Sequence, residues 1–215
     1  MIVAVTMRLA EAKGYAEQRD AISHDLIVYL DRMGVTPVLV PNTLQNPEEY
    51  LGDIGARALL LTGGDDIGPR ATESDGAATT QRDLTEARLL AEAVSHALPV
   101  LGLCRGLQLI NLHFGGGLKR DLLGAIGEKH VSCTHLIRFA DGGREERVNS
   151  YHNQGVLLSD LADPLRLLAK SPGGVVEALE HKGKNIRAVM WHPERNNPAL
   201  ALDEEVFSKW LGRDV

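Results

Sequence analysis

One segment, Pro99–Asn111 (PVLGLCRGLQLIN), constrains the fold of this chain more than any other. It begins as a short apolar run behind a proline, which predicts a strand that is buried on both faces. Beyond Cys104, the apolar residues Leu107, Ile110 and Phe114 recur at helical spacing. The chain must therefore turn from strand to helix at the cysteine, which predicts the cysteine form of a nucleophile elbow.

Two glycines flank this cysteine at the positions that a tight elbow requires. Such a turn strains its central residue and accepts only small residues two positions to either side, and Gly102 and Gly106 meet that need around Cys104. The turn presents the sulfur at the carboxyl end of the sheet, where backbone N–H groups and the helix dipole favour a thiolate. The alternative is a buried structural cysteine in a glycine-rich turn.

Bulk properties fit one α/β domain that covers residues 1–215. The 215 residues are 24% charged and 44% hydrophobic, which are globular proportions. A net charge of −6 without a Lys/Arg run argues against nucleic acid as a partner. No apolar run is long enough for a membrane span or a signal peptide. A disulfide between the two cysteines would occupy the elbow sulfur, so we expect a reducing, cytoplasmic location.

Strands and helices alternate in the first half of the chain, which predicts right-handed crossovers and a parallel sheet. In the helix before the elbow, the spacing predicts Leu84, Ala87, Leu90, Ala91 and Val94 on the buried face. We expect strands over Ile2–Thr6, Thr36–Val40, Arg57–Thr62 and from Pro99 to the elbow, helices over about Arg19–Met33, Pro47–Ile54 and Asp83–Leu98, and polar segments over Arg8–Gln18 and Ile67–Thr80.

The pattern changes in the second half, after the Gly115–Gly117 turn. Strand-like runs that are joined by short polar and glycine-rich turns predict an antiparallel extension on one edge of the sheet. A last strand and a closing helix complete the chain. We expect strands over His130–Ala140, Arg144–Ser150, Leu165–Ala169, Val175–Glu180 and Asn185–Trp191, and the helix over Pro198–Trp210.

A base for the thiol is offered near the end of the chain. A nucleophilic thiolate needs a base, and the base needs a partner that orients it. An apolar strand ends at His192, and Glu194 follows two residues later behind the stiff Pro193. Glu194 can then hold one imidazole nitrogen while the other faces the sulfur. The alternative is an exposed His-Pro-Glu turn without a catalytic role.

Two backbone N–H groups are candidates for an oxyanion hole. Attack on an amide carbonyl creates an oxyanion that needs preorganised donors. The N–H of Arg105, directly after the cysteine, is one candidate. A second has to come from a neighbouring loop that approaches closely, which favours glycine. Gly63 and Gly64 follow a predicted strand and fit that need, although an ordinary turn would carry the same residues.

Four motifs together resemble class I glutamine amidotransferases. More narrowly, the chain resembles their stand-alone branch, the γ-glutamyl-γ-aminobutyrate hydrolase-like (peptidase C26-like) proteins. The resemblance runs from Ile2 to Glu194 and implies a flavodoxin-like, three-layer α/β sandwich with a mostly parallel central sheet. The motifs are Thr62–Asp66 (TGGDD), Gly102–Gln108 (GLCRGLQ), Val148–His152 (VNSYH) and Trp191–Glu194 (WHPE).

The resemblance also implies a reaction and a set of roles. The reaction is hydrolysis of a γ-glutamyl amide through a cysteine γ-glutamyl thioester, with neither a metal nor an organic cofactor. Cys104 would be the nucleophile, His192 the general acid and base, and Glu194 its orienting partner. The other implied residues are Gly64 and Arg105 at the oxyanion, Gln108 at the glutamyl moiety, and Ser150, Tyr151 and His152 at the α-amino and α-carboxylate groups.

Two other functions remain open from the sequence. A glutaminase subunit that supplies ammonia from glutamine to a separate synthase would carry the same motifs. A non-catalytic binding relative would not need the intact Cys104, His192 and Glu194, which disfavours that function. The expected partner is a small γ-glutamyl substrate. The sequence identifies neither the released amine nor whether the chain forms a homodimer.

The polar segment Arg8–Asp20 follows the first strand at the edge where α/β folds bind ligands. Its Arg…Tyr-x-Glu-x-Arg pattern is similar to a subgroup of the stand-alone hydrolases that includes proteins acting on γ-glutamyl-CDP-amidate. Arg8 and Arg19 would pair with a phosphate or carboxylate of the leaving group. The alternative is a solvated loop followed by a charged helix start.

A pair of histidines, His130 and His135, flanks Cys133 and looks like a metal-binding cluster. Residues at odd separation in a regular strand point to opposite faces. We therefore expect that the two histidines do not converge and that the chain has no metal site.

Overall fold

The computed structural model of the protein describes residues 1–68 and 80–212. The polar segment expected over 67–80 falls mostly in residues 69–79, which lie outside the described residues. Within the described ranges, no helix is both long and apolar enough to cross a membrane. The strands are β1 (Ile2–Thr6), β2 (Arg8–Glu11), β3 (Gln18–Ala21), β4 (Thr36–Val40), β5 (Ala58–Leu61), β6 (Val100–Leu103), β7 (Cys133–Phe139), β8 (Glu145–Ser150), β9 (Leu165–Lys170), β10 (Val176–His181) and β11 (Ile186–Val189), and the α-helices are α1 (His24–Arg32), α2 (Pro47–Asp53), α3 (Gln81–Ser95), α4 (Arg105–His113), α5 (Leu122–Ile126) and α6 (Leu200–Trp210).

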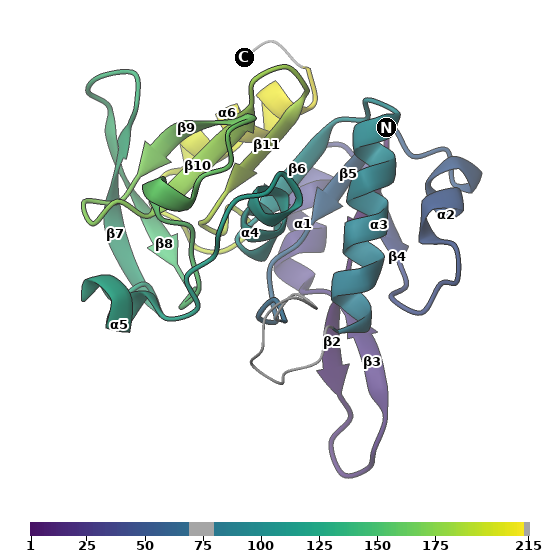
Figure 1. Cartoon of the computed structure of the whole chain (residues 1–215). Coiled ribbons are helices and arrows are strands. Elements are labelled where there is room, and N and C mark those ends of the chain that lie inside the picture. The colour runs from purple at the N-terminus through teal and green to yellow at the C-terminus, as the bar shows by residue number, and fades with distance from the viewer. Residues whose placement is uncertain (69–79, 213–215) are drawn as a thin grey trace.

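The large sheet has the strand order β4-β1-β5-β6-β11-β10-β9-β7-β8 (Figure 1). Its first five strands pair in parallel, with β6 between β5 and β11. Carboxyl ends of parallel strands lie at the same edge of a sheet. The segments that follow β5, β6 and β11 therefore meet there, and they carry three of the four motifs.

The remaining four strands form the antiparallel extension that the sequence predicts. Strand β10 pairs antiparallel with β11 and β9, and β7 pairs antiparallel with β9 and β8. The observed strands agree with the predicted ranges to within three residues at either end. This half of the sheet is the green and yellow-green part of Figure 1, opposite α2 and α3.

Helices on both faces of the sheet make the three layers expected from the resemblance. Along β5 the side chains alternate, so that Leu59 and Leu61 belong to one core and Leu60 to the other. The first core contains residues of α2, α3 and α4, including Leu89. The second contains residues of α1 and α6, including Phe207. The three-layer α/β prediction is confirmed.

The expectation of a helix from about Arg19 is wrong, and the polar segment before it contains a strand. Strands β2 and β3 form an antiparallel hairpin in which Arg8 pairs with Ala21, and the hairpin projects from the carboxyl edge of the sheet (Figure 1). Helix α1 starts only after Ser23, whose side chain caps it. The Asp20 carboxylate accepts from Asn42 N at 2.9 Å, which ties β3 to the segment after β4. Such long-range pairing leaves no local pattern in the sequence.

Helix α3 is rotated relative to the predicted amphipathic face. Leu84 is 51% exposed, whereas Arg82 and Glu86 are each 0% exposed. The guanidinium of Arg82 binds Glu86 Oε1 at 3.0 Å, and this ion pair offsets the free-energy cost of burying both charges. Hydrophobic periodicity therefore selected the wrong face, because the buried side of α3 carries paired charges next to Leu89 and Leu90.

Candidate active site

Cys104 lies between β6 and α4 in the strained conformation of an elbow, with φ 51° and ψ −101°. Its N–H donates to Val189 O at 2.7 Å, which fixes the elbow against β11. A Cβ on Gly102 would lie 2.6 Å from the carbonyl carbon of Gly106, and a Cβ on Gly106 would overlap the Leu61 carbonyl oxygen. Both glycines are therefore needed for the backbone to pass, as the sequence predicts.

His192 follows β11 and contacts both expected partners. Its Nδ1 lies 2.6 Å from Glu194 Oε1, and Cys104 is close enough to the ring to shift its pKa. Burial alone would lower the pKa of His192, but Cys104 and Glu194 outweigh it and raise the pKa to about 9. Because His192 is only 3% exposed and Cys104 5%, the pair is shielded from bulk water. The arrangement can carry a proton between a thiol and a substrate.

The sequence did not identify Asn149 as part of this site. Its Oδ1 accepts from His192 N at 2.8 Å, and its Nδ2 donates to His192 O at 2.9 Å. Asn197 extends this network, because its Oδ1 accepts from Asn149 N and its Nδ2 donates to the Asp203 carboxylate. The same carboxylate accepts from Trp191 Nε1 at 2.8 Å. Asn149 stands in the VNSYH motif, but nothing in a single sequence pointed to the backbone of His192.

The loop after β5 lies directly against the candidate nucleophile and base. A Cβ on Gly63 would lie 2.7 Å from His192 Cε1 and 3.5 Å from Cys104 Cβ. The Arg82 guanidinium holds this loop by donating to Thr62 O at 2.9 Å and Gly63 O at 3.0 Å. In a trans peptide the N–H points opposite to the C=O. The N–H of Gly64 therefore points away from Arg82.

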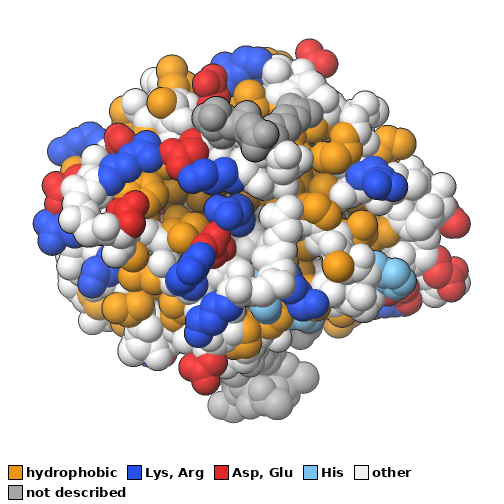
Figure 2. Space-filling model, turned by 90° about the horizontal axis from the view of Figure 1, so that it is seen from above, with side chains coloured by type: hydrophobic (Ala, Val, Ile, Leu, Met, Phe, Trp, Pro, Cys, Tyr) orange, Lys and Arg blue, Asp and Glu red, His pale blue; other side chains and the backbone are white. Residues whose placement is uncertain are grey.

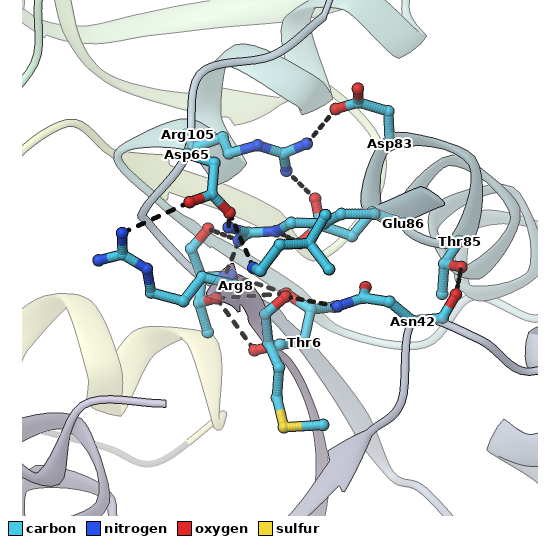
Figure 3. Close-up of polar contacts among 12 residues, drawn as sticks. Thr6, Arg8, Asn42, Asp65, Asp83, Thr85, Glu86 and Arg105 are labelled. Carbon is cyan, nitrogen blue, oxygen red and sulfur yellow. Dashed lines mark hydrogen bonds and ion pairs between the residues drawn. The ribbon is translucent and has the colours of Figure 1, made fainter. Parts of the chain in front are cut away.

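A buried charge network connects this loop to the elbow (Figure 3). The side chain of Arg105 binds the carboxylates of Asp83 and Glu86 from α3. Arg82 binds Glu86 and also Asp65, the latter at 3.1 Å. Burial, and then the charge of Arg82, lower the pKa of Arg105 to about 10 although Asp83 opposes the shift. Sequence reasoning used only the backbone of Arg105 and missed the other buried charges.

Most of the side chains predicted to receive the substrate make internal hydrogen bonds. Gln108 Nε2 donates to Gln154 O at 2.9 Å, and Ser150 Oγ donates to the backbone oxygen of His130 at 2.6 Å. Tyr151 is different, because it is 41% exposed and its ring lies edge-on to His192 with the centroids 5.6 Å apart. Of these side chains, that of Tyr151 is the one next to the candidate base.

His152 lies in a buried cluster with His130, His135 and Glu177. The expectation that His130 and His135 diverge is wrong, because β7 begins at Cys133 and His130 stands before the regular strand. Their ring centroids lie 4.6 Å apart, and those of His130 and His152 lie 4.8 Å apart. Burial lowers the pKa of His152 to about 4, although Glu177 opposes the shift.

Arg8 and Arg19 both lie on the hairpin, but only Arg8 reaches the site. Arg8 lines a pocket of about 40 Å³ together with Gly64, His192 and Glu194. Its guanidinium lies 3.4 Å from Asp65 Oδ1. The Arg19 guanidinium instead contacts side chains of its own hairpin, Glu17 and Tyr15.

A larger cavity of about 480 Å³ lies away from the elbow, between the antiparallel strands and α6. Its lining includes Phe139, Leu168 and Val206, and none of the described residues that line it is a site candidate. Figure 2 shows this end of the molecule from above, with charged side chains of both signs around apolar ones. The candidate residues Gly64, His192 and Glu194 instead line the smaller pocket beside Arg8.

A cysteine elbow beside a histidine–carboxylate pair, on a mostly parallel sheet, is typical of hydrolase-like α/β enzymes. Within that class, the chain belongs to the peptidase C26 family, whose family model matches residues 1–194.

Relatives of known name agree with this membership. The glutamine amidotransferase-like protein YvdE of Lactococcus lactis is 33% identical over 81% of both chains. The gamma-glutamyl-CDP-amidate hydrolase of Campylobacter jejuni is 27% identical over 98% of both chains. A crystal structure of a glutamine amidotransferase from Thermotoga maritima has a TM-score of 0.63 at 13% identity and covers 97% of this chain and 80% of that one. The structural similarity supports the fold alone.

Proposed function

We propose that this protein hydrolyses a γ-glutamyl amide through a γ-glutamyl thioester on Cys104. One arrangement carries the proposal: Cys104 stands at a strained elbow, and both it and His192 lie against Gly63, while Nδ1 of His192 lies 2.6 Å from Glu194 Oε1. Membership in the peptidase C26 family and the name of the Campylobacter jejuni relative support the substrate class.

Acylation begins from a state in which the proton of the Cys104 thiol has passed to His192. With a pKa of about 9, His192 is protonated at neutral pH and stabilises the thiolate beside it. The thiolate attacks the γ-carbonyl carbon, and the N–H groups of Gly64 and Arg105 donate to the oxyanion that forms. His192 then protonates the leaving nitrogen as the C–N bond breaks. The products of this half-reaction are a free amine and a γ-glutamyl thioester.

Deacylation uses the same groups in reverse. His192, now neutral, removes a proton from water, and the hydroxide attacks the thioester carbonyl. The C–S bond breaks, glutamate leaves, and the proton on His192 restores the resting pair. Glu194 keeps the imidazole in one orientation throughout, because its carboxylate accepts from Nδ1 at 2.6 Å.

Recognition of the glutamyl moiety is assigned to Gln108 and the segment Ser150–His152. Since the side chains of Ser150 and His152 make internal hydrogen bonds, we assign their contribution to the backbone. The exposed ring of Tyr151 borders the acyl site next to His192. Arg8, half-exposed at the pocket, is assigned to an anionic group on the leaving amine.

The test is release of glutamate from a panel of γ-glutamyl amides, including nucleotide-linked ones, by the purified chain alone. We expect turnover of one member of the panel and accumulation of a glutamyl adduct on Cys104, detected by mass spectrometry after acid quench. Cys104→Ser is expected to lose both signals, and Cys133→Ser, which changes the other free cysteine, is expected to keep both. An active Cys104→Ser variant would refute the mechanism.

A glutaminase subunit is the second candidate function, because several relatives carry amidotransferase names. The two functions differ in basal turnover. A hydrolase works alone on its own γ-glutamyl amide, whereas a subunit stays nearly silent on glutamine until a synthase binds. Both need a free thiol, so we assign the chain to a reducing compartment such as the cytoplasm.

A further inference from the structure

Three histidines and one glutamate from separate segments meet inside the antiparallel half of the sheet. His130 precedes β7, His135 lies within it, His152 follows β8, and Glu177 lies in β10. His130 is 3% exposed, His152 4% and Glu177 0%. Oε1 of Glu177 lies 3.5 Å from His130 Nδ1, 3.2 Å from His135 Nε2 and 3.9 Å from His152 Nε2. Polar groups buried this deeply cost free energy unless something pairs with them.

The outer nitrogens of two of these rings show where their protons sit. His130 Nε2 lies 3.2 Å from Glu128 Oε2, and His152 Nδ1 lies 2.9 Å from Gln154 O. A carboxylate or carbonyl oxygen only accepts, so both outer nitrogens carry hydrogen. In the neutral rings, His130 Nδ1 and His152 Nε2 are then bare lone pairs that face the Glu177 carboxylate. Among residues 1–68 and 80–212, neither inner nitrogen has a hydrogen-bond partner.

We propose that this cluster is a binding site for a divalent transition-metal ion of the zinc type. His130 Nδ1, His152 Nε2 and Glu177 Oε1 are the central ligands, and their donor atoms lie within 4.8 Å of one another. His135 Nε2 supplies the fourth. Ligands bound at about 2.0–2.2 Å in a tetrahedron lie about 3.3–3.6 Å apart, and the distances to Glu177 span this value. A cation there would satisfy the inner nitrogens of His130 and His152, which face the Glu177 carboxylate without a hydrogen-bond partner among the described residues.

The surroundings of the cluster resemble those of an established metal site. Histidines that bind metals usually donate their other N–H to a carboxylate or a backbone carbonyl, as His130 does to Glu128 and His152 to Gln154. Glu128 is itself fixed, because Ser171 Oγ donates to it at 3.0 Å. Three imidazoles and one carboxylate suit zinc better than the oxygen-seeking magnesium or calcium. His135, with 15% of its side chain exposed, is the side of the cluster from which an ion can enter from solvent.

The ion would have a structural role next to Ser150–His152, the segment that the proposed function assigns to the glutamyl group. The backbone oxygen of His130 accepts from Ser150 Oγ at 2.6 Å and from His152 N at 3.0 Å. The loop that places Tyr151 beside the ring of His192 is therefore already tied to the cluster. A metal bridging His130 and His152 to Glu177 would lock that loop onto β10.

The test uses the Cys104→Ser protein, because the thiol, imidazole and carboxylate at the elbow are themselves potential zinc ligands. The protein is stripped with a chelator and titrated with Zn²⁺ against a chromophoric competitor, and separately with Co²⁺. We expect one Zn²⁺ per chain, a Co²⁺ absorption spectrum typical of tetrahedral nitrogen and oxygen ligands, and a higher Tm with Zn²⁺. These readouts do not depend on turnover, so they stand whether or not the proposed hydrolysis is correct.

Variants then locate the ion. Glu177→Gln and His152→Gln are expected to weaken Zn²⁺ binding by at least about 100-fold, since each removes a ligand. Glu128→Gln changes only the outer carboxylate, which is 30% exposed, so the fold should tolerate it, and we expect about a 10–100-fold loss. His96→Gln, at an exposed histidine on the end of α3, and Cys133→Ser are expected to leave affinity unchanged.

Two results would overturn the proposal. Absence of saturable Zn²⁺ and Co²⁺ binding in Cys104→Ser would exclude a metal site at this cluster. Stoichiometric binding that survives both Glu177→Gln and Glu128→Gln would place the ion elsewhere. Folding of each variant is checked by circular dichroism, and Glu128→Gln decides the outcome if the two ligand variants fail to fold.

Discussion

Asn149 binds the backbone of His192 on both sides, accepting from its N–H at 2.8 Å and donating to its carbonyl at 2.9 Å. Asn149 is 2% exposed, so water does not replace these bonds. Its own N–H donates to Asn197 Oδ1, which belongs to the segment between β11 and α6. The position of the candidate base is thus set by an amide from the end of β8, and not by β11 alone.

Replacing Asn149 should therefore reduce catalysis through His192. Asn149→Asp keeps the acceptor for His192 N but places a carboxylate oxygen against His192 O, whereas Asn149→Ala loses both bonds. We expect a loss of about 1–3 kcal/mol of stability in urea unfolding, and kcat lower by about 100-fold because the imidazole moves. Asn46→Ala, at an exposed amide, is the control. Unchanged kcat in Asn149→Ala would mean that the turn alone positions the base.

The contact between Gly63 and the imidazole predicts a second effect. A methyl group at Gly63 would lie 2.7 Å from His192 Cε1, so Gly63→Ala must push the ring away from Cys104. We expect kcat to fall by about 100-fold with little change in Tm, because a ring shift is cheaper than a backbone shift. Gly52→Ala, where nothing lies within 4 Å, should keep full activity. Parallel steady-state kinetics and thermal melts on both variants check this.

Substitution of the elbow glycines should have the opposite effect to Gly63→Ala, because it should lower the stability of the fold itself. A Cβ on Gly102 would lie 2.6 Å from the backbone of Gly106, so α4 would have to move away from β6. Gly102→Ala should cost about 1–3 kcal/mol or more in urea unfolding. Gly143→Ala has open space and should leave stability nearly unchanged. Equal stability of the two variants would contradict the close passage of strand and helix.

Local sequence patterns predicted the parts of the fold that depend on local order. Gly102 indicates the elbow locally, because the backbone clash that it avoids is with Gly106, four residues further along the chain; the clash that Gly106 avoids is with Leu61 of β5. The alternation of strands and helices predicted the parallel half, and the motifs after β5, β6 and β11 meet because those strands are neighbours. His192 and Glu194 could be paired from their spacing, since a two-residue turn brings them together.

The features that were missed depend on partners far along the chain. The polar faces of β2 and β3 show no hydrophobic period, because they pair with each other outside the large sheet. The buried face of α3 carries Arg82 and Glu86, which look exposed until their ion pair is known. His130 and His135 converge because the strand begins between them. Only tertiary structure supplies these partners.

The raised pKa of His192 predicts how activity depends on pH. Burial would lower the pKa, but Cys104 and Glu194 raise it to about 9, so the acid that protonates the leaving amine is lost above that value. We expect kcat/KM to fall tenfold per pH unit beyond about pH 9. Because the pKa in the folded protein exceeds the ordinary 6.5, the same pair stabilises the fold fully below about pH 6.5 and loses that contribution as the pH rises through about 9.

The Glu194→Gln variant measures how much of the raised pKa of His192 is due to the Glu194 carboxylate. The amide removes the negative charge 2.6 Å from His192 Nδ1, so the pKa of His192 should fall and the alkaline limb of kcat/KM should move to lower pH. We also expect kcat to drop by about 10²–10⁴-fold, because the imidazole loses its orientation. Initial rates from about pH 6 to 10.5 check both effects, with Glu49→Gln, on the exposed side of α2, as the charge-matched control. If the alkaline limbs of Glu194→Gln and the parent protein coincide, Glu194 does not hold the proton on His192, and the proposed relay loses its third member.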